Sequence, residues 1–183
     1  IYFKYPNLVK ELVITYVNQL WVCDITYIYT IDDKFCYLHL VTDAFSRMII
    51  GYVLAPTLEA KYTIEALQQA ISHAGSGNLC GTIHHSDRGV QYCCDEYITL
   101  LKEHHIRISM TEDSNPTDNG MAERVNGIIK NEFLEPLQTP KNLLEAMPIV
   151  DHAIRTYNTL RPHLSLNIRT PAQVYEGNNN FIG

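Results

Sequence analysis

The spacing of apolar positions changes several times along the chain, and each change marks a predicted element. Between residues 19 and 54, branched and aromatic residues gather in three runs with short polar links, which is typical of an antiparallel meander. Further on, short apolar runs alternate with segments whose apolar residues recur every three or four positions, as in amphipathic helices. The predicted strands are 19–30, 35–42, 47–54, 81–85 and 106–110, and the predicted helices are 59–74, 95–104, 120–133, 143–157 and a short one after Pro171.

This order of elements predicts an α/β fold, in which a mixed five-stranded sheet is flanked by helices. A chain of 183 residues is long enough for one domain with a sizeable core. We expect a lead-in segment (1–18), a core (19–160) and a C-terminal tail (161–183) that packs on the core. The segment 114–120 is rich in turn-forming residues and predicts a loop.

The composition excludes several classes of protein. Hydrophobic residues make up 46% of the chain and charged residues 19%, as in ordinary globular domains, and no apolar run is long enough for a membrane span. Five cysteines without a CxxC pair argue against a disulfide framework or a structural zinc site and favour a reducing cytoplasm. The first residues lack the blocks of a signal peptide and an initiator Met, so we expect a piece of a longer protein.

The formal net charge of −6 argues mildly against a dedicated nucleic-acid binder, because such domains usually carry a basic excess. If nucleic acid is the substrate, part of the affinity is expected to come from regions outside this chain.

Three acidic residues stand in informative surroundings. Asp24 interrupts the apolar run WVCDITYIYT, Asp87 follows a short strand in HHSDRG, and Glu123 lies early in a predicted helix in DNGMAERVNG. The second and third acids are separated by 35 residues. Three carboxylates from distant segments can converge to hold two Mg²⁺ ions, which together activate a nucleophile and stabilise a leaving oxygen at a phosphodiester.

Each acid also has an ordinary structural interpretation. Asp24 could lie on the solvent face of an amphipathic strand, although a charge in a central strand is costly unless it is paired or bound to metal. Asp87 could cap a turn. Glu123 could offset the dipole at a helix N-terminus. On the predicted helix, Glu123 shares one flank with Gly127 and Lys130, so the flank combines a ligand with a phosphate contact.

Other residues with catalytic chemistry have better structural explanations. Asp43 ends a strand and is expected to be a turn acid, and Asp118 is expected to be the N-cap of the helix that carries Glu123. His84 and His85 are expected to pack in a strand and loop. Trp21 is expected to anchor the core or the sheet edge.

Several motifs together resemble the catalytic core of insertion-sequence transposases related to retroviral integrases. They are QLWVCDITYI, VTDAFSRMIIGY, IHHSDRGVQY, SNPTDNGMAERVNGIIKNEF, TYNTLRPHLSL and TPAQVY, and they span nearly the whole chain. The 35-residue interval is also the spacing of that family. The resemblance implies a ribonuclease-H-like fold, with residues 19–160 forming an integrase-like catalytic core.

The resemblance further implies that Asp24, Asp87 and Glu123 are the catalytic acids of a DDE-type enzyme and bind two Mg²⁺ or Mn²⁺ ions. Asn126 and Lys130 fall where similar enzymes approach DNA. Two neighbouring cations, Arg88 and Arg124, are further candidates for DNA contacts.

The implied reaction is hydrolysis at the ends of a mobile element, followed by strand transfer into target DNA. The expected partners are both DNAs and further copies of the chain, with a dimer as one option, and neither a membrane nor a small-molecule cofactor is expected. The expected location is the bacterial cytoplasm, at the nucleoid. The motif Arg161-Pro162-His163 has no derived role beyond fixing the C-terminal segment against the core.

Two other functions remain open at this point. The same acids could cut RNA in RNA–DNA hybrids, as ribonuclease H does. A repurposed domain could instead bind DNA or dimerise without catalysis, although all three acids are intact.

Overall fold

The computed structural model describes residues 3–75, 77, 79–112 and 119–179. Its centre is a five-stranded sheet in the order β3-β2-β1-β4-β5. The pairs β1–β2 and β2–β3 are antiparallel, whereas β1–β4 and β4–β5 are parallel, so the predicted mixed sheet is confirmed. The strands are β1 (Leu20–Thr30), β2 (Lys34–Asp43), β3 (Ile49–Ala55), β4 (Ile83–Ser86) and β5 (Arg107–Met110).

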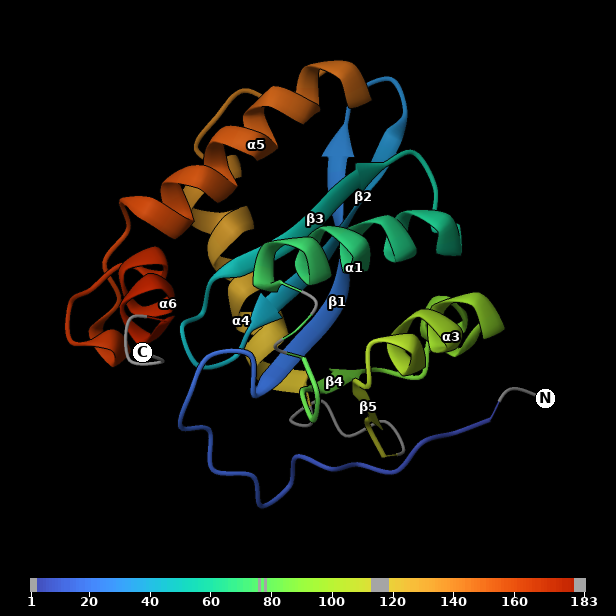
Figure 1. Cartoon of the computed structure of the whole chain (residues 1–183). Helices are drawn as coiled ribbons and strands as arrows, with labels where there is room; N and C mark the ends of the chain where they lie inside the picture. Colours follow the sequence, from blue (N-terminus) through green and yellow to red (C-terminus); the bar gives the residue numbers. More distant parts are fainter. Residues whose placement is uncertain (1–2, 76, 78, 113–118, 180–183) are drawn as a thin grey trace.

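Helices cover both faces of the sheet (Figure 1). The helices α1 and α3 lie on one face, where Leu67 and Leu101 join Trp21 of β1 in the larger apolar cluster. The helices α4 and α5 and the π-helix η3 lie on the other face, where Val125 and Ile129 pack against β1 and β2. Their bounds are α1 (Ala60–Ala74), α2 (Val90–Cys93), α3 (Asp95–Glu103), α4 (Gly120–Ile128), η3 (Ile129–Leu134), α5 (Leu143–Thr159), η4 (Leu164–Leu166) and α6 (Pro171–Asn179).

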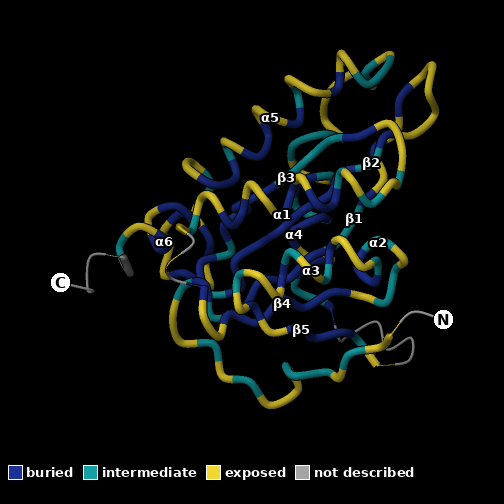
Figure 2. Tube along the Cα trace, turned by 45° about the vertical axis from the view of Figure 1, so that its right-hand side comes forward, coloured by how far each residue is buried: buried dark blue, intermediate teal, exposed yellow. Residues whose placement is uncertain are grey.

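The tube in Figure 2 shows the consequence of this layering, because the strands are mostly buried while the helices are exposed along their outer sides. Gly51 marks the closest approach between the sheet and α1. A Cβ atom at this position would lie 2.2 Å from the carbonyl oxygen of Ala66 and 2.9 Å from the amide nitrogen of Ala70. Only a glycine lets β3 approach α1 this closely.

The helix predicted over 120–133 changes its geometry midway. The α-helical part, α4, ends at Ile128, and η3 continues as a π-helix to Leu134. The amide of Glu135 donates to the carbonyl of Lys130 over 2.8 Å, which is an i to i+5 bond. Because a π-helix has more residues per turn, the helical positions expected for a continuous α-helix do not apply beyond Ile128.

The two ends of the chain both contact the core. Leu8 of the lead-in donates its amide to the hydroxyl of Ser109 in β5 over 2.8 Å. In the tail, Ala172 and Tyr175 of α6 are buried in the larger apolar cluster, and the Tyr175 hydroxyl lies 3.1 Å from Oδ1 of Asn18. Among the described residues, no helix has the length and apolar character needed to cross a bilayer.

Candidate active site

Asp24 lies in the middle strand of the sheet and points toward the helix that carries Glu123. Side chains alternate along a strand, so Asp24 shares its face with Val22 and Ile28. Ile28 packs in the cluster formed with α4, η3 and α5. Asp24 itself is half-buried at this interface. The solvent-face interpretation of Asp24 therefore does not apply.

Asp87 reaches the same place through the parallel pairing of β4 with β1. Leu20 pairs with Ile83 and Val22 with His85. The same register continued by two residues beyond the last pair places Asp87 level with Asp24. Asp87 is exposed in the loop that follows β4, at the carboxyl end of the strand, where ligands of open α/β sheets commonly bind.

Asp87 also shapes its own loop. Its Oδ1 accepts a hydrogen bond from the amide of Gly89 over 2.8 Å. A Cβ atom on residue 89 would lie 2.9 Å from that oxygen, so a side chain there would displace the carboxylate. The turn-capping interpretation of Asp87 is therefore correct, and it fixes the direction of the carboxylate.

Glu123 lies exposed in the first turn of α4. The start of this helix is tied to β1 by Asn119, whose side-chain amide donates to the carbonyl of Cys23 over 3.1 Å. Three residues beyond Glu123, the Nδ2 atom of Asn126 donates to Oδ2 of Asp24 over 2.6 Å. Both contacts attach α4 to β1 on either side of Glu123.

The three carboxylates influence one another electrostatically. The pKa of Asp24 is raised to about 6, mainly because burial disfavours the charged form, with further contributions from the nearby charges of Asp87 and Glu123. The hydrogen bonds from the Ile25 backbone and from Asn126 act in the opposite direction. A half-buried acid with two acidic neighbours is destabilised unless a cation balances the charge.

The donor set fits a hard divalent cation, because Mg²⁺ and Mn²⁺ prefer carboxylate oxygens. Within the described residues, no three His, Cys, Asp or Glu side chains converge tightly enough to form a ready metal cage. Asp24 and Asp87 are positioned by the sheet, whereas Glu123 depends on the placement of α4. The geometry therefore brings the three acids together as neighbours without closing them around an ion.

The candidate DNA contacts occupy different surfaces. Arg88 is half-buried beside Asp87 in the β4–α2 loop, and Arg124 is exposed beside Glu123 on α4. Glu123 and Gly127 line one shallow hollow, as predicted, but its next lining residues along the chain are Ile128 and Asn131, not Lys130. Lys130 is the second residue of η3, and its contact with DNA stays a prediction.

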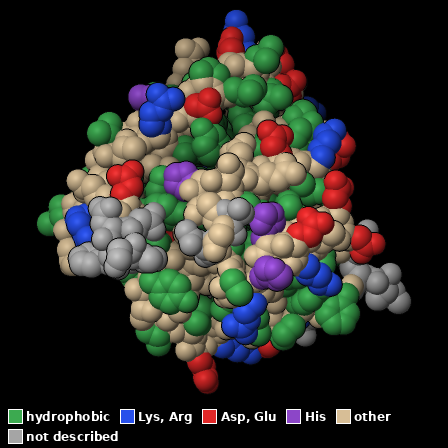
Figure 3. Space-filling view, in the orientation of Figure 1, with side chains coloured by type: hydrophobic (Ala, Val, Ile, Leu, Met, Phe, Trp, Pro, Cys, Tyr) green, Lys and Arg blue, Asp and Glu red, His purple; other side chains and the backbone are tan. Residues whose placement is uncertain are grey.

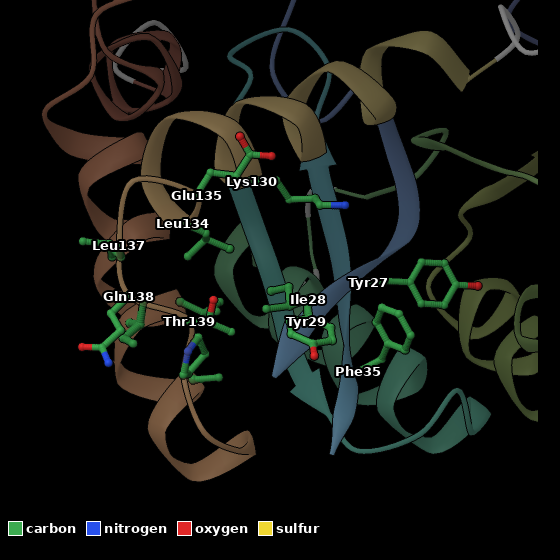
Figure 4. A pocket seen from close by; sticks show the side chains of 14 residues that line it. Tyr27, Ile28, Tyr29, Phe35, Lys130, Leu134, Glu135, Leu137, Gln138 and Thr139 are labelled. Atoms are coloured by element: carbon green, nitrogen blue, oxygen red, sulfur yellow. The ribbon is translucent and has the colours of Figure 1, made fainter. Parts of the chain in front are cut away.

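Lys130 instead lines a groove of about 340 Å³ between β1, η3 and the start of α5. Figure 4 shows Lys130 extending from the helix above the rings of Tyr29 and Phe35, with Tyr27 beside them. Ile28 on the floor of this groove belongs to the same strand as Asp24. Lys130 thus lies against the part of β1 that follows Asp24.

The residues that were expected to be structural are so in the structure. Asp43 accepts hydrogen bonds from the amides of Asn18 and Ser46, over 2.7 and 2.8 Å, and organises the turn after β2. His84 pairs with the Tyr97 hydroxyl over 2.7 Å in the core. Trp21 is fully buried.

His85 is also buried and pairs with the hydroxyl of Ser109 over 2.8 Å. Asp118, predicted as an N-cap, lies outside the described residues, and the residue that precedes α4 is Asn119. Sequence reasoning missed the role of Asn119. Asn119 makes no side-chain cap bond, and no local signal indicates its bond to Cys23, which lies 96 positions away.

The remaining surface is of mixed charge. On the face drawn in Figure 3, Lys and Arg side chains are scattered among Asp and Glu and do not merge into a broad basic patch. This agrees with the net charge of −6.

Two models of the integrase core domain match the chain, one over residues 15–116 and the other over 104–171. The transposase InsF for insertion sequence IS3A of Escherichia coli is 32% identical over 146 residues, covering 80% of this chain and 50% of the relative. The transposase for insertion sequence element IS629 of Shigella sonnei is 35% identical over 125 residues, covering 68% of this chain and 41% of the relative. The chain thus spans about half the length of these curated relatives.

A solved structure supports the same grouping. The HTLV-2 integrase catalytic core domain in complex with magnesium is 26% identical and aligns with a TM-score of 0.65, covering 87% of this chain and 97% of that one. The expected ribonuclease-H-like fold is confirmed by this likeness. The matched models and the shared architecture place this chain in the integrase core domain family, among the catalytic cores of transposases and integrases.

Proposed function

We propose that the chain is the catalytic core of a bacterial DNA transposase, which hydrolyses phosphodiesters at element ends and transfers the freed 3′ ends into target DNA. The observation that carries the proposal is the placement of Asp24 in β1, Asp87 directly after β4 and Glu123 on α4, near enough for the other two acids to raise the pKa of Asp24. Electrostatic coupling of both other acids to Asp24 supports it. The bacterial relatives named as transposases support the choice of DNA as substrate.

In this proposal the three acids hold two divalent ions, Mg²⁺ or Mn²⁺. The magnesium in the HTLV-2 integrase core supports the choice of metal. When bound, the ions would lower the pKa of the attacking water or 3′-hydroxyl and offset charge on the leaving oxygen. The carboxylates serve as ligands, so the reaction needs no covalent bond between protein and DNA.

The other residues position these ligands and the substrate. Asn126 holds Oδ2 of Asp24 by a hydrogen bond. Arg88 beside Asp87, Arg124 beside Glu123 and Lys130 on η3 supply the positive charges that would contact DNA phosphates. Two element ends must meet for transposition, so we propose a homo-oligomer on DNA, with a dimer as its smallest form, working at the nucleoid in the bacterial cytoplasm.

The test is a nicking and joining assay on a labelled element-end duplex with Mg²⁺ or Mn²⁺. The variants Asp24→Asn, Asp87→Asn and Glu123→Gln are each expected to lower joining at least about 100-fold, because each removes a charged ligand. Glu96→Gln on α3 is the matched control, since Glu96 is an exposed acid outside the proposed ligand set.

A calorimetric titration with Mn²⁺ separates metal binding from activity. Binding that disappears in the three variants and persists in Glu96→Gln supports the ligand set. Full joining by Glu123→Gln would contradict it. Cleavage of RNA–DNA hybrids without joining of DNA ends would assign the ribonuclease H activity instead, and absence of metal binding would indicate a non-catalytic domain.

A further inference from the structure

The motif Arg161-Pro162-His163 contains a buried histidine, and one of its two ring nitrogens makes no hydrogen bond with the described residues. His163 is 8% exposed, and its ring packs edge-on against Tyr157 with centroids 5.1 Å apart. Within the described part of the chain, its buried Nε2 atom has no hydrogen-bond partner. An unpaired buried ring nitrogen is costly, and a hydrogen-bond partner brought to it would remove this cost.

His163 lines a cavity of about 530 Å³ whose walls come from four separate segments. Arg47 enters from the β2–β3 turn, Arg124 from α4, and Ser165 from the segment after His163. Glu123 also contributes to the lining and is its one acid. The cavity therefore combines two guanidinium groups with imidazole and hydroxyl donors beside a proposed catalytic residue.

Arg47 is held in this wall by its backbone. Its φ is 67°, an unusual left-handed conformation for a residue other than glycine. The Tyr157 hydroxyl donates to the Arg47 carbonyl over 2.9 Å, and the Arg47 amide donates to the Asp43 carbonyl over 2.9 Å. A strained conformation that is fixed on both sides indicates that the placement of this cation matters.

Arg47 and Arg124 bring two positive charges to the cavity, against the single negative charge of Glu123. The pKa of Arg47 is lowered mainly by burial, Tyr157 and Asp43 act in the opposite direction, and the neighbouring charge of Arg124 lowers it further. The pKa of His163 is lowered by burial and by the charges of Arg161 and Arg47, against a smaller opposite effect of Glu132. A neutral His163 can donate one N–H to an acceptor, and an anion there would relieve the repulsion among the cations.

We propose that this cavity binds a backbone phosphate of the DNA, with Arg124 and Arg47 supplying charge and the Nε2–H of His163 and the Ser165 hydroxyl supplying hydrogen bonds. The inference rests on the proposed function, because it takes DNA as the substrate. It assigns the Arg-Pro-His motif a role in holding the DNA strand next to Glu123. Arg161 has a different task, since it forms a bidentate ion pair with Glu132 over 2.6 Å at both contacts.

The test measures DNA binding by fluorescence anisotropy in EDTA, so that it does not depend on the metal or on catalysis. Arg124→Gln is expected to weaken binding of an element-end duplex roughly tenfold and to reduce the salt slope by about one. His163→Leu should also weaken binding, whereas His163→Gln should retain most of it, because the glutamine amide can replace the Nε2 donor. Arg155→Gln on the exposed side of α5 is the control for loss of one positive charge.

A second measurement follows the imidazole nitrogens of His163 by NMR, with the His163→Gln variant used for assignment. The duplex is expected to shift these signals in wild-type protein and much less in Arg124→Gln. Wild-type affinity in both Arg124→Gln and His163→Leu would overturn the proposal. A response to inorganic phosphate but not to DNA would overturn it as well. If the wild-type protein binds the duplex but does not join DNA ends, the proposed function is contradicted, whereas the phosphate site still stands.

Discussion

Asn126 donates a hydrogen bond from Nδ2 to Oδ2 of Asp24 over 2.6 Å, across 102 positions of sequence. The bond connects the middle of the sheet to the helix that carries Glu123. It also favours the ionised form of the one acid whose pKa is raised to about 6. Asn126 therefore both positions Asp24 and keeps it ready to bind a cation.

Replacing Asn126 by Ala should raise the pKa of Asp24 further, because the hydrogen bond to its charged form is lost. At pH 6.5 the affinity for Mn²⁺ should fall about tenfold, as it does when the partners of metal ligands are removed. Carboxyl ¹³C NMR of the metal-free protein measures the pKa, and calorimetry measures the affinity. Asn131→Ala on the exposed side of η3 is the control. An unchanged Asp24 pKa would show that the contact has no energetic effect.

Asp24→Asn should stabilise the metal-free protein while abolishing joining. The folded-state pKa of Asp24 is raised above the ordinary value, so the native state binds more protons between about pH 4 and 6, and stability falls as pH rises through that window. Above pH 6 removal of the charge should add about 1–2 kcal/mol, allowing for partial solvent exposure, and should raise Tm by roughly 3–6 °C. Thermal unfolding in EDTA at pH 8 and pH 4 checks this, and an equal gain at both pH values would contradict it.

Two core histidines should make the fold sensitive to acid. Burial lowers the pKa of His39 to about 4 and that of His84 to about 3. Between an unfolded pKa near 6.5 and these lower values, only the unfolded chain takes up the proton. The free energy of unfolding therefore decreases by about 1.4 kcal/mol for each pH unit of acidification, for each residue.

Urea unfolding at pH 7, 6 and 5 measures this loss. The measurement is best made in the Asp24→Asn variant, because protonation of Asp24 in the wild-type protein would increase stability as the pH falls. His39→Gln should reduce the pH slope because it removes one titrating group. The fold should persist, since Gln can still pair with the Thr63 hydroxyl that lies 2.8 Å from the His39 ring. Stability that stays level from pH 6.5 to 5 would refute the prediction.

The ion pair between Arg161 and Glu132 should contribute to the attachment of the C-terminal segment. Its two guanidinium–carboxylate contacts and partial burial suggest a coupling of about 0.5–1 kcal/mol in a double-mutant cycle with Ala. The pair Lys61–Glu59 is the comparison, because both side chains are more than half exposed and no measurable coupling is expected. Equal coupling in the two pairs would remove the structural role assigned to Arg161.

Gly51→Ala should be strongly destabilising, by about 2–4 kcal/mol, because its Cβ would meet the Ala66 carbonyl at 2.2 Å and force β3 away from α1. Gly127→Ala on α4 meets no atom within 4 Å and should instead stabilise by about 0.5–1 kcal/mol. Chemical denaturation of the two variants provides the comparison. Similar effects of both changes would show that the contact between β3 and α1 is not tight.

The elements that could be predicted are those determined by local periodicity. The run from Gln19 to Thr30 is long and rich in branched and aromatic residues, and β1 occupies nearly the same span. The acid in that run was identifiable because a charge is unusual in such surroundings. The position of Asp87 relative to Asp24 was not predictable, since it depends on the parallel register of two strands that no short turn connects.

Long-range packing explains the main error. Ile129 is completely buried against the sheet, and η3 adopts a π-helix at this position, whereas the spacing of apolar residues is also compatible with a continuous α-helix. The partner of Arg161 was equally hidden, because Glu132 lies on another element 29 positions away.

The three proposed ligands are attached to the fold with unequal stiffness, and this has a consequence for ion selectivity. Asp24 lies within β1, whose backbone pairs with β2 and β4, whereas Asp87 lies in the loop after β4 and Glu123 in the exposed first turn of α4. Mg²⁺ requires short oxygen distances and near-ideal octahedral geometry, while Ca²⁺ tolerates longer and irregular ones. In the proposed site, the loop and the helix would set the distances of two oxygens from the one held in the sheet, and those distances would decide which ionic radius fits.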